Sequence, residues 1–529
     1  MHVGIVGAGI SGLYSALLLR REGHTVTVFE SEDRLGGRIF THRFTPQSGS
    51  ADVYFEVGAM RIPRSSLHSK VFDLIRYLNT HCPAEAKIEL IPYILDHENN
   101  SSFFRNKKGK LQDPSWAAKA GLPEKYHNKT PQELLGSVVL PWLNILRKDF
   151  DSGFQVSLRC FNYLRFQIGW SHEVIELVEL SCSQTNQYDL SFTEIIIQNL
   201  DFDTKDWATV KDGMSRIPQS AAALIGSQNI RLNSKVERIS YLEDGRVELS
   251  AQGLEQPYVG QFDAVIMAIP PSAVHRIVDR PQWSFMKEQA IRGSHFEPLY
   301  KIGLHFRTRF WERSTRSPCF GGQSTTDLRF RWIVFPSNDL GKNTSGVLLL
   351  YSWMSDALKW GALSRAERIK ICLHDLNKFY SDEPGVDVYS QFLEAFDVLW
   401  SNENAGGDAM FLPGQFTRFY EAAKQPEGRI YFAGEHLSRH HTWIAGAVDS
   451  ALCATADLLG RTIQGQRLLS KDGEEINDPP NTDRSLAPLG REFLTKDALL
   501  KNQKTDISSR RFKACVIPKN ENVQYVEAF

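Results

Sequence analysis

The sequence has few cysteines, and none of them belongs to a recognisable metal or disulfide motif. Seven cysteines are scattered over 529 residues, and no two are spaced as Cys-x-x-Cys. This pattern argues against a disulfide framework and against a zinc site, so no metal is expected. A run of about 18 apolar residues is also missing, which argues against a membrane-spanning helix.

Neither sign of charge is in excess. The chain has 61 basic and 62 acidic residues, a formal net charge of −1. Such a balance gives no electrostatic reason to expect a nucleic acid or a membrane surface as a partner. The sequence opens on an apolar run, residues 2–6, that leaves no room for a secretory signal. A cytoplasmic protein is therefore expected.

A glycine-rich turn follows this first apolar run. Residues 7–12, GAGISG, fit the Gly-x-Gly-x-x-Gly pattern of dinucleotide-binding folds. In this pattern Gly7 permits the tight turn, Gly9 lets the backbone approach a pyrophosphate, and Gly12 lets the next helix pack on the strand. The N–H groups at the start of that helix would face the phosphates. Glu30 ends the second strand, where its carboxylate would accept the ribose hydroxyls.

The stretch after Glu30 favours FAD over NAD. Residues 34–38, RLGGR, supply two more glycines and Arg38, whose guanidinium would clamp the phosphates. Together with the glycine turn and Glu30, this stretch resembles the flavin amine oxidase superfamily, whose members carry Arg-x-Gly-Gly-Arg after the ribose-binding acid. The resemblance implies an FAD cofactor.

The resemblance extends to the later part of the chain. Residues 428–436, GRIYFAGEH, look like the family's second FAD motif, and residues 443–447, WIAGA, stand in the place of its aromatic-x-x-Gly-Ala. By this likeness Glu435 would hold the ribityl or phosphate region. The helix after Trp443 would direct its dipole at the flavin.

Two shorter segments also match this family. Residues 213–218, GMSRIP, resemble the segment that leads back into the FAD domain. Val236 corresponds to the residue whose backbone meets the adenine. The cofactor-binding residues expected from these motifs are Gly7, Gly9, Ser11, Gly12, Glu30, Arg38, Gly58, Ala59, Met60, Arg61, Val236, Gly434, Glu435, Trp443 and Ile444.

Lys301 stands in an apolar strand, in the sequence PLYKIGLHFRTRFWE of residues 298–312. From spacing alone, a lysine in such a strand is expected on a solvated face. The segment resembles the family's active-site strand, however, in which the lysine holds a water at flavin N5. The resemblance implies a buried lysine, and burial would lower its pKa.

Arg61 lies in the apolar segment GAMRIP, residues 58–63. A guanidinium cannot shed its charge, so this setting requires an anion. The segment resembles those of L-amino acid oxidases and of related amino acid monooxygenases, where the arginine binds the substrate α-carboxylate. A buried ion pair with a protein acid such as Glu56 is the alternative interpretation.

Trp443 is expected to form an aromatic wall beside the amine-bearing carbon, while His440 and His441 line the approach. A histidine there would help to keep the substrate amine neutral. For His441, packing or positioning is favoured over direct acid–base work. The candidate catalytic residues are Lys301, Arg61, Trp443 and His441.

The chain departs from the venom-type L-amino acid oxidases in a segment that contacts the substrate carboxylate there. Residues 331–336, RWIVFP, resemble a segment that presents a tyrosine in those enzymes, but Val334 and Phe335 have no hydroxyl. Tyr351 and Tyr300 are the candidate replacements.

Two further departures concern Thr442 and Asp408. Thr442 occupies a position that is glycine in the venom-type enzymes. Residues 405–411, AGGDAMF, resemble the segment in which mitochondrial monoamine oxidases attach flavin through a cysteine, and Asp408 stands in place of that cysteine. FAD is therefore expected to bind non-covalently.

These motifs predict a mixed α/β (α+β) fold with a Rossmann-like FAD-binding domain, a discontinuous substrate-binding domain and an inserted helical subdomain. The expected boundaries are 1–65, 210–285 and 411–460 for the FAD domain, 66–112 and 286–410 for the substrate domain, 113–209 for the helical subdomain, and 461–529 for a polar C-terminal tail.

The resemblance implies oxidative deamination of an L-amino acid, with hydride transfer from Cα to flavin N5 and hydrogen peroxide formed from molecular oxygen. An amine or polyamine oxidase, in which Arg61 is only structural, is one alternative, and an amino acid monooxygenase that yields an amide is another. A flavin-containing binding module without turnover is a fourth interpretation. The accepted side chain and a homodimer both stay open.

Overall fold

The computed structural model describes residues 1–45, 53–110, 113–119, 121–148, 160–202, 204–253, 256–401, 406–461, 463–464 and 467–468. The chain divides into two compact units, residues 1–480 and 481–529, and all described residues belong to the first. Most of the predicted polar tail, 461–529, lies outside the described residues. Among the residues that are described, no helix is both long and apolar enough to cross a membrane.

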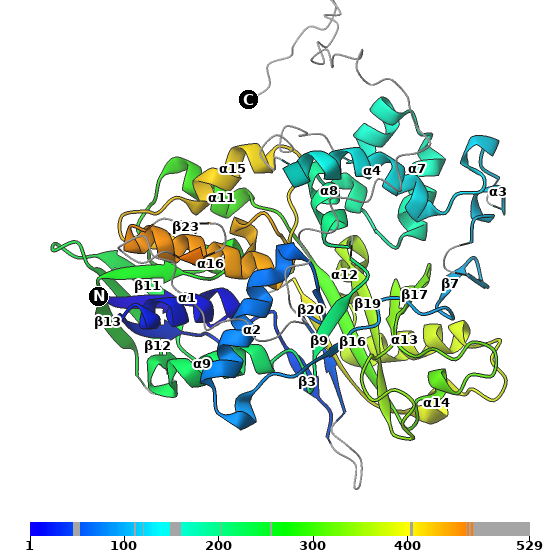
Figure 1. Cartoon of the computed structure of the whole chain (residues 1–529), viewed down its shortest axis with the longest axis horizontal. Helices are drawn as coiled ribbons and strands as arrows, with labels where there is room; N and C mark the ends of the chain where they lie inside the picture. The colour runs from blue at the N-terminus through cyan, green and yellow to red at the C-terminus, as the bar shows by residue number, and fades with distance from the viewer. Residues whose placement is uncertain are drawn as a thin grey trace, which may run out of the picture. The chain divides into compact units, whose positions relative to one another are not determined.

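A five-stranded parallel sheet forms around the N-terminal strand (Figure 1). Its strand order is β10-β2-β1-β14-β22. The strands are β10 (Ile230–Arg231), β2 (Thr25–Phe29), β1 (His2–Val6), β14 (Ala264–Met267) and β22 (Ile430–Phe432). The predicted series of strand, glycine turn, helix and strand is confirmed by β1, α1 (Ile10–Arg21) and β2. The remaining strands come from distant parts of the sequence.

Helix α1 packs against α16 (Ile444–Leu459), which runs beside it in Figure 1. Ser11 and Ala447 meet at this contact, where the Ser11 hydroxyl donates to the Ala447 carbonyl over 3.0 Å. Small side chains such as these allow the two helix backbones to approach closely. Helices α2 (Ser69–His81) and α9 (Arg216–Ile225) pack nearby, on α16 and α1 respectively.

An antiparallel meander packs on the parallel sheet. It consists of β11 (Lys235–Tyr241), β12 (Val247–Gln252) and β13 (Tyr258–Phe262). Its apolar side chains Leu249 and Phe262 share one core cluster with Val6, Phe29 and Val265 of the parallel strands. Fully buried positions alternate with less buried ones along β12, so one face of the meander is more completely covered than the other.

A second, seven-stranded sheet carries the predicted active-site strand. Its order is β20-β16-β19-β18-β17-β7-β8. The strands are β20 (Phe392–Trp400), β16 (Leu299–Phe306), β19 (Gly346–Trp353), β18 (Trp332–Val334), β17 (Gln323–Thr326), β7 (Ser101–Phe104) and β8 (Lys107–Lys110). All eight residues of β16 are buried, so the expectation from spacing that Lys301 lies on a solvated face is wrong. That expectation assumed that one face of the strand is exposed to solvent, whereas both faces of β16 are buried.

A set of helices with its own apolar core follows β8. Its elements are α3 (Trp116–Lys119), α4 (Pro131–Lys148), α6 (Cys160–Asn162), a π-helical turn η4 (Tyr163–Ile168), α7 (His172–Ser181) and α8 (Phe192–Asp201). Thr130 and Glu133 form a reciprocal capping pair at the start of α4, where Pro131 takes the first helical position. The chain then returns to sheet structure in β9 (Trp207–Val210), which pairs with β5 (Ile62–Pro63) and β6 (Leu90–Pro92).

The remaining elements are short or peripheral. They are β3 (Thr41–Arg43), β4 (Tyr54–Glu56), η1 (Ser66–His68), η2 (Ala84–Ala86), η3 (Glu124–Tyr126), η5 (Gln187–Asp189), η6 (Ser227–Asn229), α10 (Pro271–His275), α11 (Phe285–Gly293), β15 (Phe296–Glu297), η7 (Phe310–Glu312), α12 (Met354–Trp360), α13 (Arg365–Phe379), α14 (Val388–Gln391), β21 (Asp408–Ala409), α15 (Gln415–Lys424), η8 (Glu435–Leu437), β23 (Ile463–Gln464) and β24 (Arg467–Leu468).

Two glycine-to-alanine substitutions in helices are expected to change stability in opposite directions. A Cβ at Gly12 would lie 2.0 Å from the Gly7 carbonyl oxygen, so Gly12→Ala must move backbone and is expected to destabilise the protein by about 1–3 kcal/mol. A Cβ at Gly136 in α4 meets nothing within 4 Å, so Gly136→Ala is expected to stabilise by about 0.5–1 kcal/mol. Thermal unfolding at one scan rate checks both, and a higher midpoint for Gly12→Ala would contradict the close helix–strand contact.

Candidate active site

A cavity of about 470 Å³ lies at the carboxyl ends of the parallel strands. Gly7, Glu30 and Gly434, which follow β1, β2 and β22, all line it. Ligands bind at this edge in open parallel sheets. The cavity continues to β16 and β19 of the seven-stranded sheet, where Lys301 and Tyr351 line it. One continuous space therefore joins the predicted nucleotide residues to the predicted catalytic residues.

Most of the predicted site residues face this space. Those that line it are Gly7, Gly9, Ser11, Glu30, Arg38, Gly58, Ala59, Met60, Arg61, Val236, Lys301, Gly434, Glu435, Trp443 and Ile444. Gly12 and His441 are not among its lining residues. Gly12 instead lies inside α1, against the Gly7 carbonyl.

The nucleotide end of the cavity fits a dinucleotide. The Ala8 N–H donates to one Glu30 carboxylate oxygen over 2.8 Å, and the Glu32 N–H donates to the other over 3.0 Å. These bonds fix the carboxylate and leave acceptor capacity for ribose hydroxyls. A Cβ at Gly9 would meet no protein atom within 4 Å, so this glycine faces open space. Its backbone is therefore accessible to a phosphate.

Arg38 and Glu435 are paired with each other at the rim of the cavity. Arg38 Nη1 lies 2.7 Å from Glu435 Oε1 and donates to the Gly407 carbonyl over 2.8 Å. Glu435 also accepts the backbone N–H groups of Ala409 and Thr442, each over 2.9 Å. Burial alone would raise the pKa of Glu435, but Arg38 and neighbouring histidines lower it below its usual range. This carboxylate is therefore held as an anion.

The backbone of Thr442 supports this arrangement in an unusual conformation. Its φ angle is 72°, in the left-handed region that favours glycine. The glycine found at this position in the resembling enzymes would adopt the same conformation without strain. Thr442 keeps its N–H on Glu435 nevertheless, so the threonine is accommodated.

Lys301 is buried, with 4% of its surface exposed. Its Nζ donates to the Gly58 carbonyl over 2.5 Å and lies 4.8 Å from the centre of the Tyr351 ring. Burial, and secondarily the positive charge of Arg61, lowers the pKa of Lys301 to about 7. The predicted lowering of the pKa by burial is confirmed. The amine can therefore exchange a proton near neutral pH.

Arg61 has no ion-pair partner within 4 Å among the described residues. Its Nη1 donates to Gln323 Oε1 over 3.3 Å, and its guanidinium lies 5.2–5.7 Å from three aromatic rings, those of Phe202, Trp207 and Tyr93. Burial raises the pKa of Asp96, an effect that the charge of Arg61 opposes, yet the two groups form no ion pair.

The alternative ion pair between Arg61 and Glu56 is wrong. The Glu56 carboxylate accepts the Thr41 hydroxyl over 2.8 Å and the Met214 N–H over 2.9 Å. Burial raises the pKa of Glu56 to about 7. Glu56 and Arg61 are close in sequence, but the backbone bends at Gly58 between them, so their side chains do not meet. The two side chains point into different surroundings.

The two tyrosines considered as carboxylate ligands differ in position. Tyr351 lines the cavity. Tyr300 is stacked on Trp360, with ring centres 4.8 Å apart, and its hydroxyl donates to Asp397 over 3.1 Å. Only Tyr351 is therefore placed to contact a ligand. Val334 and Phe335 are buried elsewhere and do not line the cavity.

His441 is packed outside the cavity. Its ring is stacked on Phe416, with an interplanar angle of 9°, and its Nδ1 lies 3.1 Å from Glu194 Oε2. Burial alone would lower the pKa of His441, but Glu194 raises it above the usual value. These contacts tie the loop before α16 to α8. They agree with the packing or positioning role that the sequence favoured for this histidine.

Trp443 and Asp408 both face the cavity. The Trp443 ring meets His68 edge to face, with centres 5.1 Å apart, and lies 5.9 Å from Trp207. Burial and the nearby Glu435 raise the pKa of Asp408 to about 7. The predicted roles of the lining residues stay predictions.

Several lining residues were not foreseen from the sequence. They are Gln198, Phe202, Gln323, Trp332, Trp353 and Met410. Trp353 follows Tyr351 by two positions in β19, so strand alternation was a signal that both rings share one face. Gln198 lies in α8 and Phe202 directly follows this helix. No local sequence pattern could predict that the end of α8 packs against a sheet that is distant in the sequence.

Comparison with known proteins identifies one protein family. The family described as flavin containing amine oxidoreductase matches residues 10–459. YobN of Bacillus subtilis (strain 168), provisionally named an L-amino-acid oxidase, is 31% identical over 471 residues, covering 85% of this chain and 93% of YobN. L-amino-acid oxidase 4 of Hebeloma cylindrosporum is 27% identical, covering 92% of this chain and 87% of that protein.

Two solved amine oxidases have the same fold. Putrescine oxidase bound to putrescine superposes with a TM-score of 0.69 at 18% identity, covering 87% of this chain and all of that one. Cyclohexylamine oxidase from Brevibacterium oxydans IH-35A gives 0.65 at 20% identity, covering 87% and 98%. These neighbours confirm the expected mixed α/β fold class.

The open space at Gly9 leads to a prediction about cofactor retention. Gly9→Ala places a methyl where a phosphate would meet the helix N–H groups, so we expect flavin affinity to fall at least about tenfold. The stability of the flavin-free protein should not change, because the methyl meets no protein atom. Bound flavin per chain, measured by absorbance after gel filtration, checks this. Gly136→Ala is the matched control, and full retention by Gly9→Ala would contradict the assignment.

The burial of Lys301 leads to a pH-dependent stability prediction. Its pKa is about 7 in the folded chain against 10.5 for a free lysine, so the unfolded chain binds more protons between these pH values and stability rises with pH across this window. Lys301→Met removes this dependence. We expect a gain of roughly 3 kcal/mol at pH 6 that vanishes near pH 10.

Urea unfolding at pH 6, 8 and 10 would measure this gain. The exposed Lys370 offers a control, since Lys370→Met should shift stability equally little at all three pH values. A gain from Lys301→Met that is the same at pH 6 and pH 10 would show that the folded lysine titrates normally.

Proposed function

We propose that this chain, which belongs to the flavin-containing amine oxidoreductase family, is an L-amino acid oxidase that binds FAD non-covalently. The products would be a 2-oxo acid, ammonia and hydrogen peroxide. The FAD would supply the chemistry of accepting a hydride from the substrate Cα and returning the electrons to molecular oxygen. The names of two relatives at about 30% identity support this proposal.

The observation that carries the proposal is the unpaired charge of Arg61. Its guanidinium lies among aromatic rings and has only the neutral Gln323 as a hydrogen-bond partner among the described residues. The side chain is half-buried, and an unpaired charge that is partly removed from water is costly unless an anion approaches it. Because the group lines the cavity, the substrate α-carboxylate can supply that anion. The planar fork of arginine holds a carboxylate in one orientation.

Tyr351 would complete the binding of the carboxylate. It lines the same cavity, and the Lys301 ammonium and the Tyr351 ring are 4.8 Å apart. The carboxylate would therefore lie between Arg61 and Tyr351, close to Lys301. Fixing the carboxylate fixes the position of Cα, which supplies most of what a hydride transfer requires.

Lys301 would bind a water molecule and exchange protons with it. With a pKa of about 7 and a carbonyl partner at Gly58, its amine is able to donate to or accept from a water in the cavity near neutral pH. Trp443, on another wall, would shield the amine-bearing carbon from solvent. Its aromatic contacts with His68 and Trp207 keep the ring in place.

Arg61→Met tests the proposal. We expect L-amino acids to bleach the flavin of the unaltered enzyme under anaerobic conditions, whereas D-enantiomers and the matching decarboxylated amines should not. In Arg61→Met the apparent affinity for L-amino acids should fall about a hundredfold, because a charge-assisted pair with the carboxylate is lost. Arg246→Met, which removes an exposed arginine paired with Asp244, is the matched control.

The same assay separates the alternatives. Bleaching by amines rather than by L-amino acids would make Arg61 structural and the chain an amine oxidase. If L-amino acids bleach the flavin but an amide and carbon dioxide form in air, the chain is a monooxygenase. A flavin that no substrate bleaches would indicate a binding module.

A further inference from the structure

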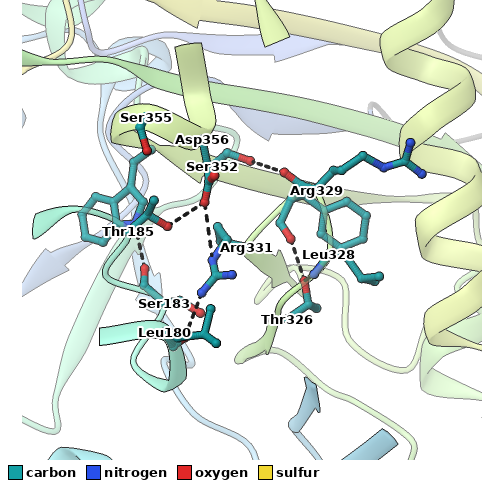
Figure 2. A network of polar contacts seen from close by, with 12 residues as sticks. Leu180, Ser183, Thr185, Thr326, Leu328, Arg329, Arg331, Ser352, Ser355 and Asp356 are labelled. Atoms are coloured by element: carbon teal, nitrogen blue, oxygen red, sulfur yellow. Dashed lines mark hydrogen bonds and ion pairs between the residues drawn. The ribbon is translucent and has the colours of Figure 1, made fainter. Parts of the chain in front are cut away.

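A polar seam joins the helical set to the seven-stranded sheet beside the active site. Its residues are Leu180, Ser183 and Thr185 on the helical side and Arg331, Trp353 and Asp356 on the sheet side. All of them except Trp353 are labelled in Figure 2. We refer to these six residues as the seam. The first three lie at or just after the end of α7, and the others lie next to β18, at the end of β19 and in the first turn of α12.

Arg331 is the buried charge of the seam, with 4% of its surface exposed. Its Nη2 donates to the Leu180 carbonyl over 2.8 Å, and its Nε lies 3.8 Å from Asp356 Oδ2. Leu180 belongs to the last turn of α7, where carbonyl groups carry partial negative charge. The buried guanidinium is stabilised by this turn and by Asp356, with further attraction from Asp327 and Glu179. Arg331 therefore ties the two sides together.

Asp356 forms a second link between the two sides of the seam, in which it accepts a hydrogen bond from the helical side. The Thr185 hydroxyl donates to Asp356 Oδ2 over 2.7 Å, the same oxygen that faces Arg331. Lys359, which is largely exposed, donates to the other oxygen over 2.7 Å. The carboxylate thus stays paired if Arg331 loses its charge, which makes substitution of Arg331 the milder way to loosen the seam.

Trp353 links the seam to the active site. Its indole N–H donates to the Ser183 carbonyl over 2.8 Å, and its ring lines the cavity next to Tyr351, with ring centres 6.1 Å apart. Met354, directly after it, is fully buried with a φ of 55°. A conformation of this kind persists only where the surroundings enforce it. The Trp353 ring is therefore held from the helical side as well as by its own strand.

We infer that Arg331 is a positioning residue that holds the turn after α7 against Asp356 and so keeps the Trp353 ring in place as a wall for the substrate side chain. The inference rests on the proposed function, because it takes the carboxylate to be at Arg61. A large side chain would pack on the fixed ring, whereas a small one would not reach it. Loosening the seam should therefore weaken the binding of substrates with large side chains more than that of substrates with small ones.

Arg331→Met tests this inference in the FAD-loaded enzyme. We expect kcat/KM for L-phenylalanine to fall about tenfold, mostly through KM, because the packing area on Trp353 is lost. The value for L-alanine should change less than about twofold, and flavin content should not change. Arg331→Lys, which keeps the charge, should restore part of the loss.

The chain offers a matched control in the same connection. Arg329 lies two residues before Arg331 but pairs with Asp375 through two bonds of 2.5 and 2.8 Å, away from the cavity. Arg329→Met removes an arginine and an ion pair without touching the seam. Its ratio of kcat/KM for the two substrates should equal that of the unaltered enzyme.

A binding measurement keeps the inference testable without turnover. 3-Phenylpropanoate and propanoate carry the carboxylate but no amine to oxidise, and their dissociation constants can be read from shifts in the flavin absorption spectrum. Arg331→Met should raise the dissociation constant of 3-phenylpropanoate about tenfold and leave that of propanoate unchanged. If neither L-amino acid is oxidised but this difference is found, the proposed function fails and the inference stands.

Three outcomes would overturn the inference. They are equal effects on large and small ligands, a fall in kcat alone, and no binding of either acid to the unaltered protein. Should Arg331→Met not fold, Trp353→Phe replaces it, because it keeps a ring but removes the bond to Ser183. It should lower the preference for the large ligand about threefold, and an unchanged preference would contradict the role of the seam.

Discussion

The ion pair between Arg38 and Glu435 is the contact on which the shape of the cavity depends. Three segments far apart in the sequence, 38, 407–409 and 435–442, meet at this carboxylate through one guanidinium and two backbone N–H groups. Each oxygen of Glu435 fixes a different part of the rim. Replacing the acid would leave the half-buried guanidinium without its counter-ion and the two N–H groups without their acceptor, and such losses are larger than the net value of the bonds themselves.

Inside this rim, the cavity collects groups whose charges are not fully compensated by the protein. Arg61 is a permanent cation with a neutral partner, while Lys301 and Asp408 each have a pKa moved to about 7 by burial. Clusters of perturbed groups in a cavity are typical of catalytic sites. A bound carboxylate would rebalance this set, because it would give Arg61 the ion-pair partner that the described residues do not supply.

The sequence predicted the nucleotide end of the site better than the chemical end. Local spacing was sufficient for the glycine turn and Glu30, because a short loop and the strand after it set their geometry. Resemblance alone predicted a buried Lys301, since spacing assigned it to a solvated face and could not show that α12 covers one side of β16 and Phe55 of β4 packs on the other. Gln323 was missed because its place beside Arg61 depends on long-range strand pairing, and Phe202 because its place beside Arg61 depends on the docking of α8.

The order of strands in the parallel sheet also governs when the site can form during synthesis. Strand β1 lies between β2 and β14, and β14 is completed on its other side by β22, residues 430–432. The hydrogen bond from the Ser11 hydroxyl also cannot form until Ala447, 436 positions later, has been synthesised. At roughly 5–20 residues per second, a ribosome takes on the order of half a minute or more to supply that distance. Through this interval the β1–β2 pair lacks β14, β22 and α16, so the apolar residues of these strands stay uncovered until α16 has emerged.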